Sequence, residues 1–274
     1  MSMTISDEKM ILEKAHNLLA AAGVKSFPLR MKPIIAYLQT GNELQVVKYT
    51  TMAKLMNVPV ETIGFKVGSD EAALVYTGPD KPTTIYYKDV WIPKVRIRWN
   101  LGHEVAHFCC GHHLIEYRVK CSGLEMSKAT AAHIEAEANT FSRAMHAPLE
   151  LVLLFMGYYK IYDRLGVFAI LRGIFQMSVP ASYYYANRIF NRPVRGLFDI
   201  EHLRQYLDFY HDFTATFNRA AFAAVQRRYE PEYDMFEKHL NRRVLPDYRL
   251  PYQESISAIV GRVLPRSDDN AGLA

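Results

Sequence analysis

Residues 98–113, RWNLGHEVAHFCCGHH, carry the feature that most constrains the fold of this chain. Within them, His103, Glu104 and His107 form an H-E-x-x-H pattern. On a helix, residues i and i+4 lie on one face, about 5–6 Å apart at their Cβ atoms. Two imidazoles at that spacing can bind one Zn²⁺, with about 2 Å between each nitrogen and the metal. The pattern therefore predicts a helix that supplies two ligands, and a further ligand must come from elsewhere.

Glu104 directly follows the first predicted ligand, so its carboxylate can reach the metal's open position. In catalytic zinc sites a water molecule occupies that position, and zinc lowers its pKa toward about 7. A neighbouring carboxylate can accept the proton of that water. We therefore predict that Glu104 is the general base. The alternative is a chance match of a short pattern on a helix whose histidines are solvated.

Two regions offer the third ligand. His113 stands at the spacing of the metzincin pattern H-E-x-x-H-x-x-G-x-x-H, but Cys110 occupies the position where that pattern needs glycine. The second region is the helix expected over residues 127–147, which contains the acidic residues Glu135 and Glu137.

Glu135 belongs to a polar stripe on that helix. The apolar stripe beside it consists of Ile134, Ala138, Phe141 and Met145. Glu135 and Asn139 are i and i+4, so a carboxylate ligand would stand beside an amide able to hold the free N–H of a ligand histidine. Glu137 lies about 200° around the helix from Glu135 and is the second choice.

Two blocks of the sequence resemble the ImmA/IrrE family of metallopeptidases. RIRWNLGHEVAHFCCGHH is similar to the family's R-x-R-F-T-L-A-H-E-L-G-H-like block, and EAEANTFSRAMHAP is similar to its E-x-E-A-N-x-F-A block and the proline ending that follows. The matching or nearly matching residues are Arg96, Arg98, Trp99, Leu101, His103, Glu104, His107, Glu135, Glu137, Ala138, Asn139, Phe141 and Pro148. The likeness extends over residues 10–190. The chain departs from the family at Asn100, Gly102 and His146, where threonine, alanine and a hydrophobic residue are usual, and FCCGHH replaces a run of leucines.

The resemblance implies a gluzincin-like site, with His103, His107 and Glu135 as ligands of Zn²⁺ and Glu104 as the base. It implies a zinc metalloendopeptidase that cleaves a protein, a helix-turn-helix transcriptional repressor, and so relieves repression in a mobile element or a stress response. The alternative is a non-proteolytic regulatory module that holds a repressor or DNA and uses the metal structurally.

The predicted elements give an α+β order. Strands are expected at residues 45–50, 61–68, 72–78 and 83–90, with a hairpin turn at 69–71, and helices at 7–22, 30–38 and 51–57. The H-E-x-x-H helix is expected to begin after Asn100, a suitable N-cap. We therefore expect a small N-terminal mixed sheet packed on a pair of active-site helices, zincin-like by resemblance, followed by a helical C-terminal region.

Three parts are expected along the chain: a zinc metallopeptidase domain at 1–155, a helix-turn-helix-like segment at 156–193, and a helical extension with a frayed tail at 194–274. The middle segment is similar to one that follows the peptidase in some relatives. Its second helix begins with Ser182 and three tyrosines, where a DNA-reading helix would carry Arg, Lys, Asn or Gln. We therefore favour a packing module or a protein-binding surface over DNA binding.

The composition narrows the setting. A net charge of +5 with 22% charged residues does not indicate a strongly basic nucleic-acid binder. Lys160, Asp163 and Arg164 interrupt the most apolar stretch, so no membrane span is expected. The segment MSMTISDEKM lacks the apolar core of a signal peptide, and the 3 cysteines lack disulfide spacing. We therefore expect a reducing, cytoplasmic location.

Several residues near the predicted ligands have open roles. Cys109 and Cys110 are expected to be small buried hydrophobic residues, or alternatively thiolates that bind and block the metal. His112 and His113 are expected to be solvated or lightly hydrogen-bonded. The candidates for stabilising an oxyanion are Tyr86, Tyr87, Arg143 and His146.

Overall fold

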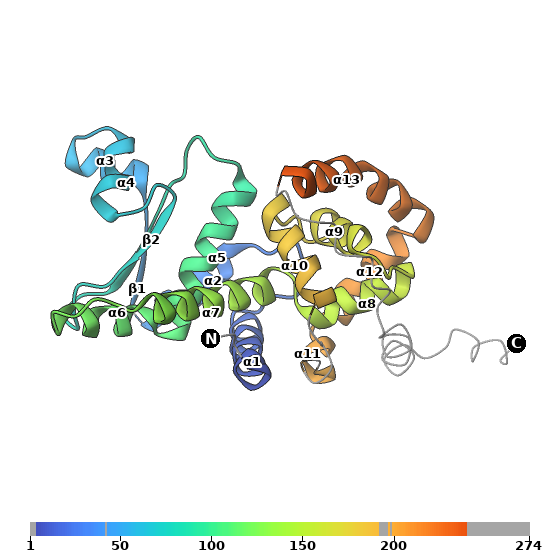
Figure 1. The fold of residues 1–274 in the computed structure, drawn as a ribbon, viewed down its shortest axis with the longest axis horizontal. Helices are drawn as coiled ribbons and strands as arrows, with labels where there is room; N and C mark the ends of the chain where they lie inside the picture. The colour runs from blue at the N-terminus through green and yellow to red at the C-terminus, as the bar shows by residue number, and fades with distance from the viewer. Residues whose placement is uncertain (1–3, 42, 192–196, 198, 240–274) are drawn as a thin grey trace, which may run out of the picture. The chain divides into compact units, whose positions relative to one another are not determined.

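The computed structural model describes residues 4–41, 43–191, 197 and 199–239. It confirms the α+β class, because many helices accompany one small mixed sheet (Figure 1). The chain divides into two compact units, Met1–His146 and Ala147–Ala274. No helix among the described residues has the length and apolar character that crossing a membrane requires.

The sheet lies in the first unit and has three strands in the order β1-β3-β2. The strands are β1 (Leu44–Lys48), β2 (Ala72–Val75) and β3 (Thr83–Tyr87). β1 runs parallel to β3, and β2 runs antiparallel to it. The central strand is the most buried, with Ile85 fully enclosed. β2 therefore stands at one edge of the described sheet, beside the helices of the site.

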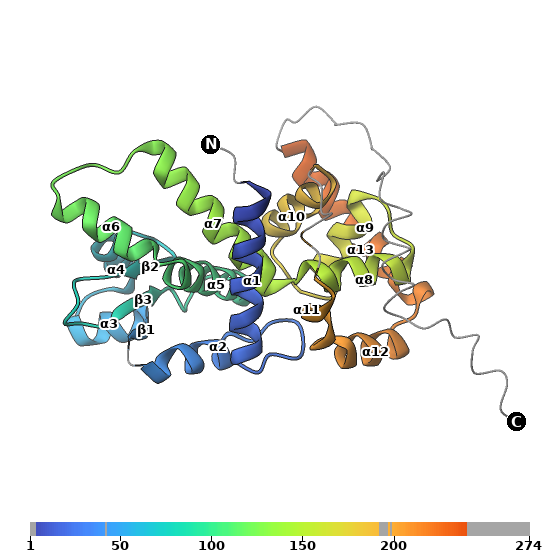
Figure 2. The same cartoon turned by 90° about the horizontal axis from the view of Figure 1, so that it is seen from below.

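The first unit contains seven α-helices among the described residues. They are α1 (Ile5–Ala21), α2 (Met31–Leu38), α3 (Tyr49–Met56), α4 (Val60–Val67), α5 (Lys94–Cys110), α6 (His112–Cys121) and α7 (Lys128–His146), with a short 3₁₀ turn η1 (Gln39–Gly41). α5 contacts β2, β3 and α7, so it lies between the sheet and α7 (Figure 1). α1 packs across α7 (Figure 2). This core positions the site.

The strand predicted at residues 61–68 is wrong, because these residues form helix α4. Tertiary burial decides the outcome: Ile63 packs against Tyr49 and Ala53 of α3. Gly68 then ends the helix in the left-handed region, with φ of +80°. The hairpin predicted around 69–71 is therefore also wrong, and β2 pairs with β3 instead.

The predicted start of the H-E-x-x-H helix is also wrong. α5 begins at Lys94, directly after Pro93, which stands at the N-cap. Asn100 lies within the helix and does not cap it. Its Nδ2 donates to Oε2 of Glu71 at 2.8 Å, and Nε of Arg96 donates to the same oxygen at 2.8 Å. These contacts fasten the first turns of α5 to the chain just before β2.

The second unit is helical. Its described helices are α8 (Leu149–Tyr159), α9 (Arg164–Gly173), α10 (Val179–Asn191), α11 (Ile200–Arg204), α12 (Leu207–Thr216) and α13 (Arg219–His239). The division between the units falls earlier than the predicted boundary after residue 155, which lies inside α8. α8 belongs to the second unit because it packs against α9, α11 and α13. The expected segments 156–193 and 194–239 share this unit, and residues 240–274 lie outside the described residues.

The start of α10 is packed. Ser182, Tyr183 and Tyr185 are all buried. The ring of Tyr183 lies 5.5 Å from that of Tyr233 and 5.1 Å from that of Phe236, both on α13. These contacts favour the packing interpretation of the helix-turn-helix-like segment.

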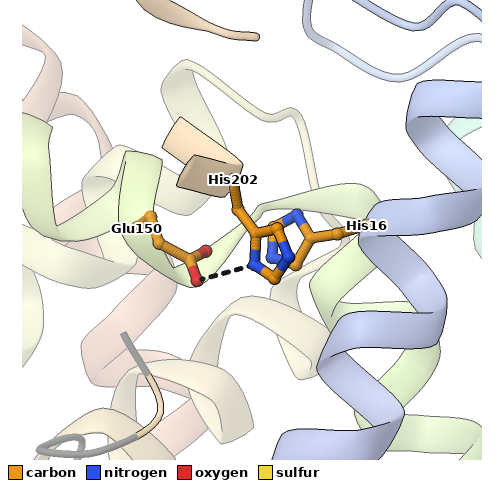
Figure 3. A group of neighbouring side chains, drawn as sticks. All are labelled: His16, Glu150 and His202. Atoms are coloured by element: carbon orange, nitrogen blue, oxygen red, sulfur yellow. Dashed lines mark ion pairs between the residues drawn. The ribbon is translucent and has the colours of Figure 1, made fainter. Parts of the chain in front are cut away.

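A buried carboxylate joins two helices of the second unit. Glu150 on α8 is fully buried, and its Oε1 lies 3.8 Å from Nδ1 of His202 on α11 (Figure 3). The backbone N–H of Asp199 donates to the same oxygen at 3.4 Å. The pair is ionic when His202 is protonated, and it holds α11 against α8.

Candidate metal centre

Three side chains of the first unit converge where α5 faces α7. His103 and His107 come from α5, and Glu135 comes from α7. The Nε2 atoms of the two histidines lie 3.1 Å apart. The two oxygens of Glu135 lie 3.3 Å from Nε2 of His103 and 3.4 Å from Nε2 of His107. The structure thus brings together the three residues that the sequence predicts as ligands.

These distances fit a zinc ion. Tetrahedral ligands at about 2.0–2.1 Å from zinc lie about 3.3 Å from one another. All three separations are close to that value, and two imidazoles with one carboxylate are a donor set that catalytic zinc sites use. The side-chain contacts of Glu135 with His103 and then His107 hold its pKa well below its usual range, which keeps that carboxylate ionised.

The close approach of α5 and α7 depends on Gly102. A Cβ atom there would overlap Cε1 of His146 and lie 3.0 Å from Cε of Met145. His146 is buried, with Nδ1 2.8 Å from the carbonyl oxygen of Ser142 and Nε2 3.2 Å from that of Arg98. Burial lowers the pKa of His146 to about 4. The neutral imidazole therefore fills the space that the missing side chain of Gly102 leaves.

Glu104 lies beside the three predicted ligands. Burial raises the pKa of its carboxyl, while His103, His107 and a backbone hydrogen bond from Leu74 oppose the rise. Glu104 opens onto a cavity of about 320 Å³. The cavity is lined by Ser69, Glu71, Ala72, Trp99, Asn100, His103, Glu104, Glu135 and Asn139. The predicted base therefore shares one cavity with His103 and Glu135.

β2 forms one wall of this region. Lys88 N donates to Glu71 O at 2.8 Å, so Glu71 faces β3. Because ladder bonds in an antiparallel pair alternate, the backbone groups of Ala72 and Leu74 face away from β3. Ala72 N lies 3.3 Å from Oγ of Ser69, and Leu74 donates toward Glu104. The edge of the described sheet therefore points toward the predicted base.

The sequence reasoning missed a connection behind His107. Nδ1 of His107 lies 3.1 Å from Nδ1 of His112. Nε2 of His112 lies 2.9 Å from Oε2 of Glu137. His112 is buried and hydrogen-bonded, so it takes the second of its two expected states, and Glu137, the second choice of ligand, is half-buried.

The signal that could have found this connection is Gly111. It has φ of +74° and ends α5, so α6 begins at once with His112 turned back toward α5. Asn139, by contrast, does not take the expected role. Its Nδ2 donates to the backbone oxygen of Glu135 at 2.8 Å instead of holding a ligand histidine.

His113 lies outside the converging group, so the metzincin spacing brings no third ligand to it. Its buried ring stacks on Phe108, with 5.3 Å between the ring centroids. His113 lines a second cavity of about 480 Å³, together with Tyr76 and residues 79–83. His113 is therefore buried and not solvated, and its hydrogen bond to the backbone of His107 matches the lightly hydrogen-bonded alternative.

Cys109 and Cys110 are half-buried. Burial raises the pKa of Cys109 to about 12 and that of Cys110 to about 11. Neither belongs to the converging group of described residues, and both thiols stay protonated at neutral pH. These facts favour the small-hydrophobe interpretation over the inhibitory thiolate.

The expected oxyanion-stabilising residues lie elsewhere. None of the four candidates lines the cavity of Glu104 as the described residues form it. Arg143 donates to Oγ1 of Thr140 at 2.9 Å, and His146 is enclosed between the helices. The amide side chains of Asn100 and Asn139 line the cavity instead.

A scan against protein-family models found no match to this chain, and searches of curated proteins and of solved structures also found none. The family resemblance therefore depends on the two sequence blocks, and the site is described by its geometry alone.

Proposed function

We propose that this protein is a zinc-dependent endopeptidase of the ImmA/IrrE type, with a zincin-like packing of sheet, α5 and α7. His103, His107 and Glu135 would hold the zinc ion. The observation that carries the proposal is the mutual spacing of their donor atoms, 3.1 to 3.4 Å, beside the carboxylate of Glu104. A bound zinc ion supplies Lewis acidity toward water and toward a carbonyl oxygen.

Glu104 performs the proton transfers in this proposal. Its raised pKa makes its carboxylate a better proton acceptor than an exposed glutamate at neutral pH. It takes a proton from the attacking water and passes it to the leaving amine. The backbone N–H of Leu74 donates to this carboxylate and keeps it in place between these two steps.

The edge of β2 supports a peptide substrate. The backbone carbonyls of Ala72 and Leu74 face away from β3, while their N–H groups already donate to Ser69 and Glu104. An extended peptide can add along this edge by donating its own N–H groups to these carbonyls. Main-chain hydrogen bonds then align the scissile bond with the cavity, largely independently of the peptide's sequence. A protein substrate with an extended, accessible segment fits this arrangement.

The identity of the substrate follows from the resemblance. We propose that it is a helix-turn-helix transcriptional repressor, that its cleavage relieves repression in a mobile element or a stress response, and that the reaction takes place in the cytoplasm. The test is to co-incubate the purified protein with a small helix-turn-helix protein encoded in a neighbouring reading frame. Mass spectrometry of the products identifies any cleavage site.

The Glu104→Gln variant tests the mechanism. It should keep the fold and the zinc content of the wild type while cleavage falls by about 10²–10⁴-fold, the usual contribution of a general base. The Glu125→Gln variant makes the same chemical change at an exposed position before α7 and should cleave normally. Unchanged cleavage by Glu104→Gln would refute the role of this residue.

The Glu135→Gln variant tests the ligand set. The wild type should contain one zinc per chain by elemental analysis, and Glu135→Gln should lose most of it. Zinc retained at full affinity would exclude Glu135 as a ligand. A stable, uncut complex with the repressor that survives a chelator would instead support the regulatory binding module.

A further inference from the structure

We infer that Glu137 and His112 are positioning residues that fix the proton arrangement of His107, so that its Nε2 meets the metal as an unprotonated nitrogen. The inference rests on the proposed metal site but not on peptidase activity. It follows from an unbroken series of contacts from the carboxylate of Glu137 on α7, through His112 on α6, to His107 on α5.

The order of donors and acceptors in this series is fixed from the Glu137 end. An ionised carboxylate only accepts hydrogen bonds. Nε2 of His112 therefore carries a hydrogen and donates to Oε2 of Glu137 over 2.9 Å. In a neutral imidazole the other nitrogen is then unprotonated, so Nδ1 of His112 is an acceptor.

The same reasoning extends to His107. Its Nδ1 lies 3.1 Å from the acceptor Nδ1 of His112, so it carries the hydrogen. Nε2 of His107 is then unprotonated, and this is the atom that lies 3.1 Å from Nε2 of His103 and 3.4 Å from Glu135. The nitrogen that a metal needs is therefore made available before any metal binds.

The two histidines of α5 differ in this respect. Nδ1 of His103 is buried and has no hydrogen-bond partner among the described residues. Nδ1 of His107, in contrast, is linked to the carboxylate of Glu137 through His112, whose side chain is 1% exposed. Because His112 is so deeply enclosed, water does not compete for its nitrogens. Glu137 and His112 therefore determine which nitrogen of His107 carries the hydrogen.

The Glu137→Gln variant separates this role from simple packing. Glutamine keeps the shape, but its amide can either accept from Nε2 of His112 or donate to it. When it donates, every proton in the series shifts, and Nε2 of His107 gains a hydrogen. Loss of such a positioning partner typically costs about 10–100-fold in metal affinity.

The experiment is a competition between a chromophoric chelator and the full-length apoprotein for zinc. Glu137→Gln should bind about 10–100-fold more weakly than the wild type. His133→Gln is the matched control: Nε2 of His133 lies 3.5 Å from the other oxygen of Glu137, on the exposed side. It should bind as the wild type does. Equal affinity of wild type and Glu137→Gln would overturn the inference and leave the proposed function standing.

A second measurement needs no variant. The ¹⁵N shifts of the imidazole nitrogens in the wild-type apoprotein report which nitrogen carries the hydrogen. At about pH 8.5, above the ordinary histidine pKa of about 6.5, His107 should show a protonated Nδ1 and an unprotonated Nε2. The opposite arrangement would overturn the inference even if Glu137→Gln unfolds. A wild type that binds no zinc at all would refute the proposed function as well.

Discussion

Gly102 is the position where one added methyl group should disturb the candidate site most. In Gly102→Ala the new Cβ would overlap Cε1 of His146. The imidazole cannot swing aside easily, because it is buried between α7 and α5, with its nitrogens 2.8 Å and 3.2 Å from carbonyl oxygens and its single N–H donating to one of them. The ring of Trp99, which lines the cavity, also lies 5.3 Å from it. The methyl group therefore has to push the helices apart or break these contacts.

The magnitude follows from two opposing contributions. Overpacking a close-packed contact costs about 1–3 kcal/mol. Replacing glycine by alanine inside a helix returns about 0.5–1 kcal/mol. Because His146 is held on both sides, we expect a cost near the upper end and a net loss of about 2 kcal/mol in the free energy of unfolding. Zinc affinity should fall too, because His103 follows Gly102 directly.

The assay is urea denaturation of four proteins: wild type, Gly102→Ala, His146→Ala and the double variant. His146→Ala removes the ring that the methyl group meets, so adding Gly102→Ala to it should stabilise by about 0.5–1 kcal/mol. The coupling energy should therefore be about 3 kcal/mol. If Gly102→Ala costs the same in both backgrounds, or costs nothing in the wild type, the close approach of α5 and α7 at this point is wrong.

Two further outcomes follow from burial. Folding lowers the pKa of His146 to about 4, so its contribution is present above its unfolded pKa of about 6.5 and is lost as the pH falls toward 4. Urea denaturation should thus show that the free energy of unfolding of the wild type falls by about 2–3 kcal/mol more between pH 7 and pH 4.5 than that of His146→Leu. Equal losses in the two proteins would refute a buried, neutral His146. Burial also raises the pKa of Cys109 and Cys110, so iodoacetamide should alkylate the exposed Cys121 first. Mass spectrometry checks the order, and faster labelling of Cys109 would contradict it.

Spacing along the sequence predicted the elements that depend on local pattern. The i, i+4 spacing of His103 and His107 and the polar stripe containing Glu135 indicated that these side chains could converge, and the structure brings them together. The segment at 61–68 failed because its β-branched residues suit a strand, whereas burial of Ile63 against α3 makes it a helix. The β-propensity of these residues carries no information about that tertiary contact.

The connection behind His107 was missed for a different reason. No helical periodicity links His112 to Glu137, because they belong to separate helices and meet only after the chain turns at Gly111. A pair of adjacent histidines after a helix end is easily taken as solvated. The positive φ of Gly111 places His112 against His107, and sequence spacing carries no such information.

Gly102 and His146, two positions at which the chain departs from the ImmA/IrrE sequence blocks, pack against each other and form one compensated change. The ImmA/IrrE resemblance places alanine at the first position and a hydrophobic residue at the second, and each difference alone looks unfavourable. In this chain the two residues touch, and a Cβ atom at position 102 would occupy the place of the imidazole. Glycine gives up helix propensity, and histidine gives up its charge and donates its single N–H to one of the two carbonyl oxygens beside it. Because both changes meet beside the turn that carries His103, they preserve the helix crossing on which the candidate site depends.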